Sequence, residues 1–402
     1  MPDHFAPVAP PSDLRPPAAA DFKPDAWRGG AERHRVGRTL TGQWWWVDPV
    51  RGPVAVAGVQ GAVQSLGDAP VVDALREWGF NLLAPPVAEG FCDRAVPHLH
   101  HLALRQAGDL AIRSVGVLLP DVFDPRWPAA VEQVANAVRR TASLAGYVTD
   151  DELRWGAVAA PDAPLTRPGL LQACLSLDPA FAAYHAAWEF VFATRGGELA
   201  QLARDWGLAL ANKESVRQMT RDEIALDSPG YRVDLERFQR EFALRYHRIV
   251  AESVRRVDPA RLLLSAPLNE VTPLVVRDSA AAHFDVLLVR QPGLGQGRAA
   301  ELLWEYNWSA LAALPADADE PWGVSLLERV VVKGREELSQ LLMDPHIVGY
   351  VWSHHVAGDT IEANPVSPGL LDGSGRINPL TVAPLTALNR AATAIRASNA
   401  PG

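Results

Sequence analysis

The sequence predicts an α/β protein of the (β/α)8 barrel class. Eight short apolar runs rich in Val, Ile and Leu follow one another along the chain, and helical patterns separate most of them. This alternation is typical of a parallel sheet whose strands are joined by helices, and eight runs favour a closed TIM barrel over an open sheet. The predicted strands are residues 53–60, 81–86, 112–119, 145–150, 262–268, 284–290, 323–328 and 348–354.

Two segments precede the first predicted strand. Residues 1–35 are rich in Pro and Ala and hold no apolar period, so we expect a flexible arm followed by one barrel domain at 36–400. The segment GQWWWVDPV at 42–50 predicts an N-terminal β-hairpin cap. Side chains alternate along a strand, which sends Trp44 and Trp46 one way and Trp45 the other. This favours packing over the alternative, a platform for a ligand.

A long helical stretch interrupts the alternation, since about 110 residues separate the fourth and fifth strands. We expect a helical insertion at about 156–232. A doubly wound sheet is the alternative architecture, but it would require a glycine-rich phosphate loop after an early strand. The GLGQG segment at 293–297 follows the sixth strand in a Pro-rich context and predicts a turn.

The composition excludes several classes of partner. The chain of 402 residues carries a net charge of −9, and its lysines are dispersed, so nucleic acid is not an expected partner. No apolar run reaches the roughly 18 residues that a membrane span needs. The first residues lack the pattern of a signal peptide, which predicts a cytoplasmic protein. The oligomeric state is left open.

Cysteine and histidine do not predict a metal or another cofactor. Cys92 and Cys174 are too few for a disulfide framework and lack metal-ligand spacing. The PHLHH segment at 97–101 falls in the predicted helical region after strand two, where surface histidines are the expected interpretation.

Catalytic residues of barrel enzymes lie at the carboxyl ends of the strands. Strand four ends in TDDELRW at 149–155, and predicted strand seven ends in Glu328. Two carboxylates facing each other across the barrel mouth are what a retaining glycosidase needs, and Trp155 and Trp352 would supply faces for sugar rings. The alternative is that these carboxylates cap helices or pair with arginine.

Several segments, in order, resemble agarase-type glycoside hydrolases of family fifty and its relatives. They are GQWWWVDPVRGPVAVAGV, WGFNLL, LLPDVFDPRW, AGYVTDDELRWG, the stretch 238–267 and DPHIVGYVWSHHVAGD. The resemblance spans roughly residues 36–395. It implies a retaining hydrolase acting on a β-linked, galactose-containing saccharide, with Glu152 as acid/base and Glu328 as nucleophile.

The chain also departs from that family pattern. Asp151 stands where the family has an Asn that donates to a sugar hydroxyl, and an ionised Asp cannot donate. Asn269 and Glu270 follow strand five, and Arg290 follows strand six. A guanidinium at the mouth favours an anionic saccharide, or else it only neutralises nearby acids. His354 is expected to hydrogen-bond substrate.

The departures keep two other functions open. One is a catalytically altered barrel that binds a carbohydrate-like ligand, and the other is acid/base chemistry on a non-sugar metabolite. The expected substrate-binding set is Asp151, Trp155, Asn269, Glu270, Arg290, Trp352 and His354.

Overall fold

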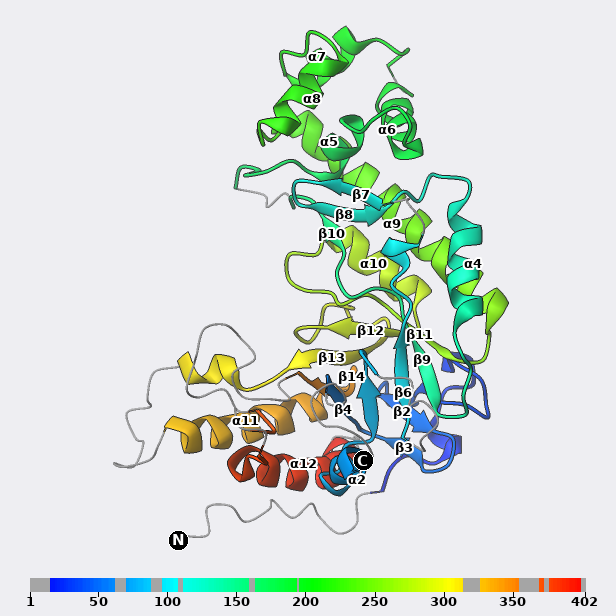
Figure 1. Cartoon of the computed structure of the whole chain (residues 1–402), viewed down its shortest axis with the longest axis vertical. Coiled ribbons are helices and arrows are strands. Elements are labelled where there is room, and N and C mark those ends of the chain that lie inside the picture. The colour runs from blue at the N-terminus through cyan, green and yellow to red at the C-terminus, as the bar shows by residue number, and fades with distance from the viewer. Residues whose placement is uncertain are drawn as a thin grey trace.

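Eight parallel strands form a closed barrel, which confirms the predicted (β/α)8 class (Figure 1). In chain order the strands are β4 (Val56–Gln60), β5 (Leu82–Ala84), β6 (His98–His101), β9 (Leu144–Val148), β11 (Leu262–Leu264), β12 (Val286–Val289), β13 (Ala300–Tyr306) and β14 (Ile347–Trp352). The computed structural model describes residues 15–61, 70–87, 96–107, 111–158, 163–193, 195–313, 326–353, 369–371 and 376–398. One side-chain cluster, which includes Leu99, Leu264 and Leu302, fills the barrel interior.

Two of the barrel strands differ from the prediction. The third strand is β6, within the PHLHH segment that we expected on a helix surface, and His98 in it is buried. The seventh strand is β13. The last residues of the predicted strand 323–328 belong instead to the first turn of helix α11 (Leu326–Met343). Both strands place a polar side chain in a buried position, so neither reads as an apolar run.

The predicted strand at 112–119 is a hairpin outside the barrel. It consists of β7 (Ala111–Ser114) and β8 (Val117–Pro120), joined by a turn in which Gly116 has a φ of +71°. The hairpin pairs with β10 (Arg154–Trp155) in a three-stranded antiparallel sheet. This small sheet stands over one side of the barrel mouth (Figure 1).

The three tryptophans close the N-terminal end of the barrel, as predicted. They form β2 (Trp44–Asp48), which pairs with β1 (Arg35–Arg38) and β3 (Gly52–Val54). Trp44 and Trp46 belong to the cluster that fills the barrel, while Trp45 packs in a separate cluster with Phe22 and Ala397. All three indoles are buried, so this segment is a structural cap.

The structure differs from the expected arm in the part of residues 1–35 that it describes. Phe22 is buried, it bridges Thr39 through the backbone, and Arg28 bridges Val36 in the same way. The Gly30 N–H donates to the Ala260 carbonyl at 2.7 Å. Aromatic residues within the Pro-rich stretch therefore fasten it to the cap.

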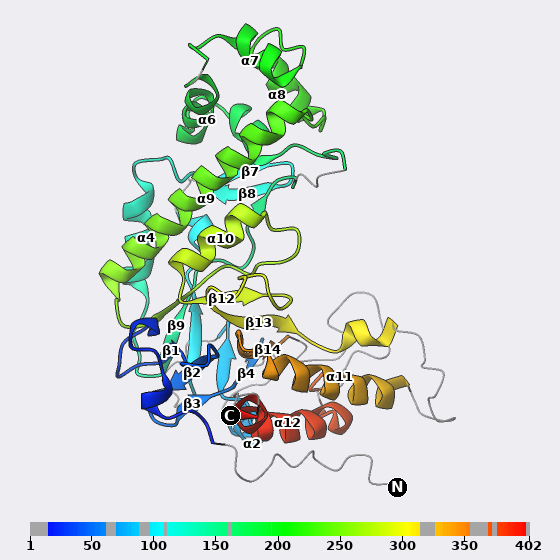
Figure 2. The ribbon, with the colours of Figure 1, turned by 180° about the vertical axis from the view of Figure 1, so that it is seen from behind.

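Four short helices lie between β10 and the long helix α9 (Pro229–Val257), within the range of the expected insertion. They are α5 (Leu170–Leu175), α6 (Ala182–Phe192), α7 (Leu199–Trp206) and α8 (Lys213–Arg221). They occupy the end of the molecule opposite α11 and α12 (Pro379–Ala397), and α9 runs from them along the rear of the barrel (Figures 1 and 2). The other α-helices within the described residues are α2 (Pro70–Glu77), α4 (Trp127–Ala137) and α10 (Leu274–His283).

The GLGQG segment forms a turn, as predicted. The N–H groups of Gly293 and Gly295 donate to the carboxylate of Glu301 on β13, at 2.8 and 2.7 Å. The acceptor for this loop is therefore a side chain of the same protein. No helix in the described part of the chain combines the length and apolarity needed to cross a membrane.

Candidate active site

The acidic segment that follows strand β9 begins with a buried carboxyl group, Asp150. Its Oδ1 accepts the Arg105 N–H at 2.8 Å, and its Oδ2 accepts the hydroxyl of Tyr246 on α9 at 2.7 Å. Burial raises the pKa of Asp150 to about 7, although both hydrogen bonds act in the opposite direction. Asp150 thus ties the end of the fourth strand to the third strand's loop and to α9.

Asp151 and Glu152 come next and are half-exposed at the barrel mouth. Arg105 pairs with Asp151 at 3.1 Å and donates to the Glu152 carbonyl at 3.1 Å. Arg154 Nε donates to Glu152 Oε1 at 2.7 Å. Two arginines therefore position the carboxylate that sequence analysis expects to act as acid/base.

The seventh strand ends in a second glutamate, Glu305. Leu303 pairs with Tyr350 and Tyr306 pairs with Trp352, so β13 has one residue more than β14 between these pairs. Glu305 lies in this bulge with a φ of +55°, in the left-handed region that non-glycine residues seldom adopt. Strain of this kind concentrates at functional sites.

Neighbouring groups hold Glu305 in that conformation. Its carbonyl oxygen accepts hydrogen bonds from Asn307 Nδ2 at 3.2 Å and from Ser353 Oγ at 3.3 Å. Its carboxylate pairs with Arg290, which follows strand six, at 2.6 Å. The bulge turns a carboxylate toward the mouth that a regular strand would not present there.

Glu152 and Glu305 line one cleft of about 720 Å³ at the carboxyl ends of the strands. Four residues of the expected substrate-binding set, Asp151, Trp155, Asn269 and Arg290, line it as well. Residues of the small sheet and of the loop that follows it also line the cleft, and Arg167 on that loop is exposed with no partner among the described residues. The cleft is thus lined by both acidic and basic groups.

The two tryptophans expected at the site have different surroundings. Trp155 lines the cleft while its ring meets the rings of Phe242 and Tyr246 edge to face, at 6.1 and 6.2 Å. Trp352 is fully buried, and its ring meets Trp308 edge to face at 5.1 Å. Trp352 is not among the described residues that line the cleft, and its contact with substrate stays a prediction.

Other expected residues lie away from the cleft or outside the described residues. Glu328 lies in the first turn of α11, after the seventh strand and not at its tip, so the predicted strand position is wrong. Glu270 is exposed and is not among the described residues that line the cleft. His354 lies outside the described residues.

Polar groups beside the carboxylates could bind hydroxyl groups. Thr272 Oγ1 donates to Asn269 Oδ1 at 3.0 Å. The side-chain Nδ2 of Asn269 makes no hydrogen bond to the described residues. His101 ends the third strand, and burial lowers its pKa. Among the described residues, no group of three or more His, Cys, Asp or Glu is arranged to hold a metal ion.

Sequence reasoning missed Glu305 because β13 (AELLWEY) mixes charged and apolar residues. One signal could have found it. The segment lies between the sixth and eighth strands, and its Leu302, Leu303 and Trp304 form a short apolar run that ends in a glutamate.

Comparison with known proteins identifies the fold. No family model matches the chain, and no curated protein matches it in sequence. The agarase AgWH50C has 16% sequence identity and a TM-score of 0.70, over 96% of this chain and 68% of that one. PfGH50B has 15% identity and a TM-score of 0.70, over 95% of this chain and 70% of that one.

A third solved structure agrees with these two. An exo-β-agarase has 14% identity and a TM-score of 0.68, over 94% of this chain and 69% of that one. At such identities the likeness is one of fold. The resemblance stated from the sequence is confirmed at that level, and the chain has the fold of these agarase-type barrels along nearly its whole length.

Proposed function

We propose that this protein is a retaining glycoside hydrolase in which Glu152 is the acid/base and Glu305 is the nucleophile. One observation carries the proposal. Carboxylates at the ends of the fourth and seventh strands line the same cleft at the mouth of the barrel. This is the pair that a double displacement requires, and it moves the nucleophile from Glu328 to Glu305.

In the first step, Glu152 gives its proton to the glycosidic oxygen as that bond breaks, and Glu305 forms a bond to the anomeric carbon. In the second step, Glu152 takes a proton from water, and the water oxygen displaces Glu305. The ion pair with Arg290 supports the role of Glu305 as nucleophile, because the guanidinium holds the carboxylate in place at the mouth. Substrate oxygens would replace Arg154 beside Glu152.

The proposed substrate is a β-linked saccharide that contains galactose. The fold shared with agarases supports this class. Asp151 stands where the family has an Asn, and an ionised Asp cannot donate a hydrogen bond. The side-chain amide of Asn269 lines the same cleft and can donate one to a sugar hydroxyl. Arg290 is already paired with Glu305, which favours the interpretation that it neutralises a local acid.

The test compares three isosteric variants on aryl β-galactosides and agaro-oligosaccharides. Glu152→Gln and Glu305→Gln should each lower kcat by about 10³-fold or more, because each removes a group that takes part in bond making. Glu328→Gln is the matched control and should stay near wild type. Full activity in Glu305→Gln with loss in Glu328→Gln would overturn the reassignment of the nucleophile.

A second candidate is a barrel that binds a saccharide without cleaving it. It is favoured by the ion pairs that occupy both glutamates and by Asp151 in place of Asn. Calorimetry with agaro-oligosaccharides distinguishes the two functions. Binding without any turnover, unaffected by Glu152→Gln, would favour this second candidate.

A further inference from the structure

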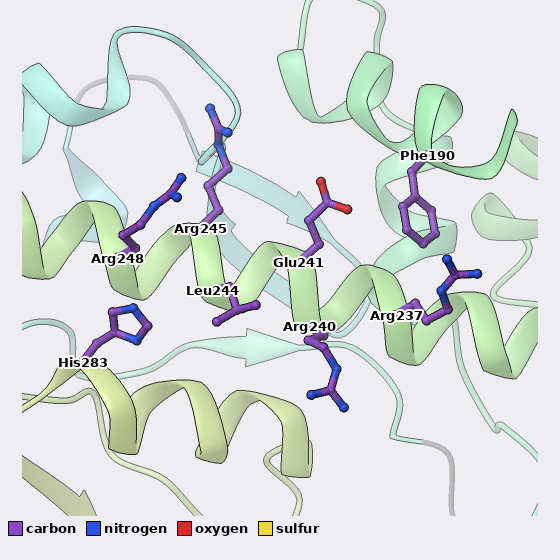
Figure 3. A pocket seen from close by; sticks show the side chains of 8 residues that line it. All are labelled: Phe190, Arg237, Arg240, Glu241, Leu244, Arg245, Arg248 and His283. Carbon is purple, nitrogen blue, oxygen red and sulfur yellow. The ribbon is translucent and has the colours of Figure 1, made fainter. Parts of the chain in front are cut away.

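A second hollow lies on the outer side of α9, away from the cleft. It measures about 510 Å³, and Figure 3 shows the side chains that line it. They come from α9, from α6 and from the end of α10, and they are Phe190, Arg237, Arg240, Glu241, Leu244, Arg245, Arg248 and His283. We call this hollow the α9 groove. The cleft lies on the other side of the helix, where Trp155 packs on Phe242 and Tyr246.

The α9 groove concentrates positive charge on a protein whose net charge is −9. Four of its lining residues are arginines and one, Glu241, is a carboxylate. Such a concentration attracts anions, because four guanidinium groups outnumber the single carboxylate of the lining.

The arginines of the α9 groove have weak carboxylate partners or none among the described residues. Arg248 is exposed and makes no ion pair there, and Arg245 donates to the Val122 carbonyl at 2.8 Å. Arg237 lies 3.7 Å from Asp234, a carboxylate that Arg195 already holds at 2.8 Å. Arg248 is thus available to a ligand, and Arg245, whose Cζ also lies 5.1 Å from the centroid of the Phe123 ring, has further N–H groups to offer.

Arg240 has a partner, but an exposed one. Its pair with Glu236 spans 3.5 Å, and both side chains are more than half exposed. Exposed pairs of this kind contribute little and exchange readily for a better oxyanion. Arg237 and Arg240 stand toward one end of the α9 groove and Arg245 and Arg248 toward the other, so the backbone positions of these two arginine pairs lie about 12 Å apart at 1.5 Å per residue.

Glu241 lies between these pairs, and this position restricts the ligand. A densely charged phosphate backbone would bring an anion against the carboxylate. A saccharide that carries sparse anionic groups can instead place a hydroxyl there, and a carboxylate accepts hydrogen bonds from hydroxyls. Phe190 at one end, with Arg237 5.8 Å from its ring centroid, adds an apolar surface for a sugar ring.

We propose that the α9 groove binds a saccharide chain bearing sulfate or carboxylate groups. The two arginine pairs contact the anionic groups, and Glu241 contacts hydroxyls between them. This inference does not depend on the proposed hydrolysis, because none of its residues belongs to the cleft.

The experiment is a calorimetric titration of the full chain at low salt. The probes are a heparin-derived hexasaccharide, hexagalacturonate and neutral maltohexaose, with a twelve-nucleotide oligo-dT as the polyphosphate. The two anionic saccharides distinguish sulfate from carboxylate recognition. We expect at least one of them to bind, with affinity that falls as salt is added, and no binding of maltohexaose.

The variants localise the binding. Arg240→Ala combined with Arg248→Ala should weaken it by about tenfold or more, since two charge-assisted contacts are removed. Arg51→Ala is the matched control, because Arg51 is exposed at the N-terminal end of the barrel, and it should bind as wild type does.

Three results would overturn the proposal. They are the absence of binding by both anionic saccharides, an equal loss in Arg51→Ala, and oligo-dT binding as tightly as the saccharides. The last result would assign the α9 groove to nucleic acid. Unchanged turnover of the double variant on a neutral substrate would show that the α9 groove acts separately from the cleft.

Discussion

The two ends of the barrel use the same residue types for opposite purposes. At the N-terminal end, Arg396 is fully buried beneath Trp45 and donates to the backbone carbonyls of Trp44, Leu342, Asp344 and Pro345. At the mouth, Arg154 and Arg290 are more than half exposed and pair with carboxylates. A buried arginine thus holds the N-terminal end together, and exposed arginines bind the carboxylates at the mouth.

The difference follows from what surrounds each guanidinium. A buried cation must satisfy its donors with fixed acceptors, and carbonyls at the end of α11, in the segment after it and at the start of β2 supply them without adding a second charge. An exposed cation beside a carboxylate keeps water as an alternative partner, so a substrate can displace it. Stability and function are therefore expected to separate by barrel end.

The largest effect should come from Arg396. Replacing it with Met removes a donor from four carbonyls inside the cap, of which that of Pro345 keeps the Trp44 N–H, and we expect a loss of about 3–5 kcal/mol in the free energy of unfolding. Arg396→Lys should recover part of this loss. Urea denaturation measures it, and an unchanged midpoint in Arg396→Met would contradict the role of the cap.

The matched change at the mouth is Arg290→Ala. It should alter stability by less than about 0.5 kcal/mol, because the side chain is exposed. Turnover should fall by about 10²-fold, because Glu305 loses the cation that orients it. If stability and turnover changed together in both variants, the separation of the two ends would be refuted.

The next effect concerns pH and Asp150. Burial raises its pKa to about 7 in the folded protein, against an ordinary value near 4. Between these values only the folded state holds the proton, so unfolding releases it, and raising the pH from 4 to 7 lowers stability. The side chain introduced by Asp150→Asn cannot ionise, so this variant should lose the pH dependence. The difference amounts to up to a few kcal/mol in unfolding free energy between pH 4 and 7. Melting temperatures at closely spaced pH values test it.

Much of the barrel could be predicted because most of its strands are buried on both faces and read as apolar runs. The exceptions are β6 and β13, in which His98 and Glu301 are buried and polar. Glu301 is tolerated because the N–H groups of Gly293 and Gly295 satisfy its carboxylate, a contact made only once the chain has folded.

The candidate site likewise contains residues that could be predicted from the sequence and one that could not. Asp151 and Glu152 follow an uninterrupted apolar strand, so their position at the mouth can be read from the sequence. Glu305 depends on a left-handed residue and a bulge, which Asn307 and Ser353 hold from outside the strand. Local propensity opposes that conformation for Glu, and tertiary contacts override it.

A smaller effect tests the bulge directly. Glycine adopts the conformation of Glu305 without strain, and alanine does not, so Glu305→Gly should be more stable than Glu305→Ala by about 1 kcal/mol. Both variants lose the carboxylate and should be inactive. Equal unfolding free energies would mean that the bulge relaxes when Glu305 is replaced.

The smallest effect returns to the cap. Trp46 Nε1 donates to His34 Nδ1 at 3.0 Å, and burial lowers the pKa of His34. The unfolded chain therefore takes up a proton first as the pH falls below about 6.5, so this group destabilises the fold on acidification. The sign is opposite to that of Asp150, and between about pH 4 and 6.5 the two slopes offset each other. In Asp150→Asn, stability should fall as the pH is lowered through this range, because burial lowers the pKa of His100, His101 and His247 as well, and His34→Gln should reduce that fall by about 1 kcal/mol. If His34→Gln left the acid slope of Asp150→Asn intact, the slope would belong to other groups, and the cap would have no part in the pH response.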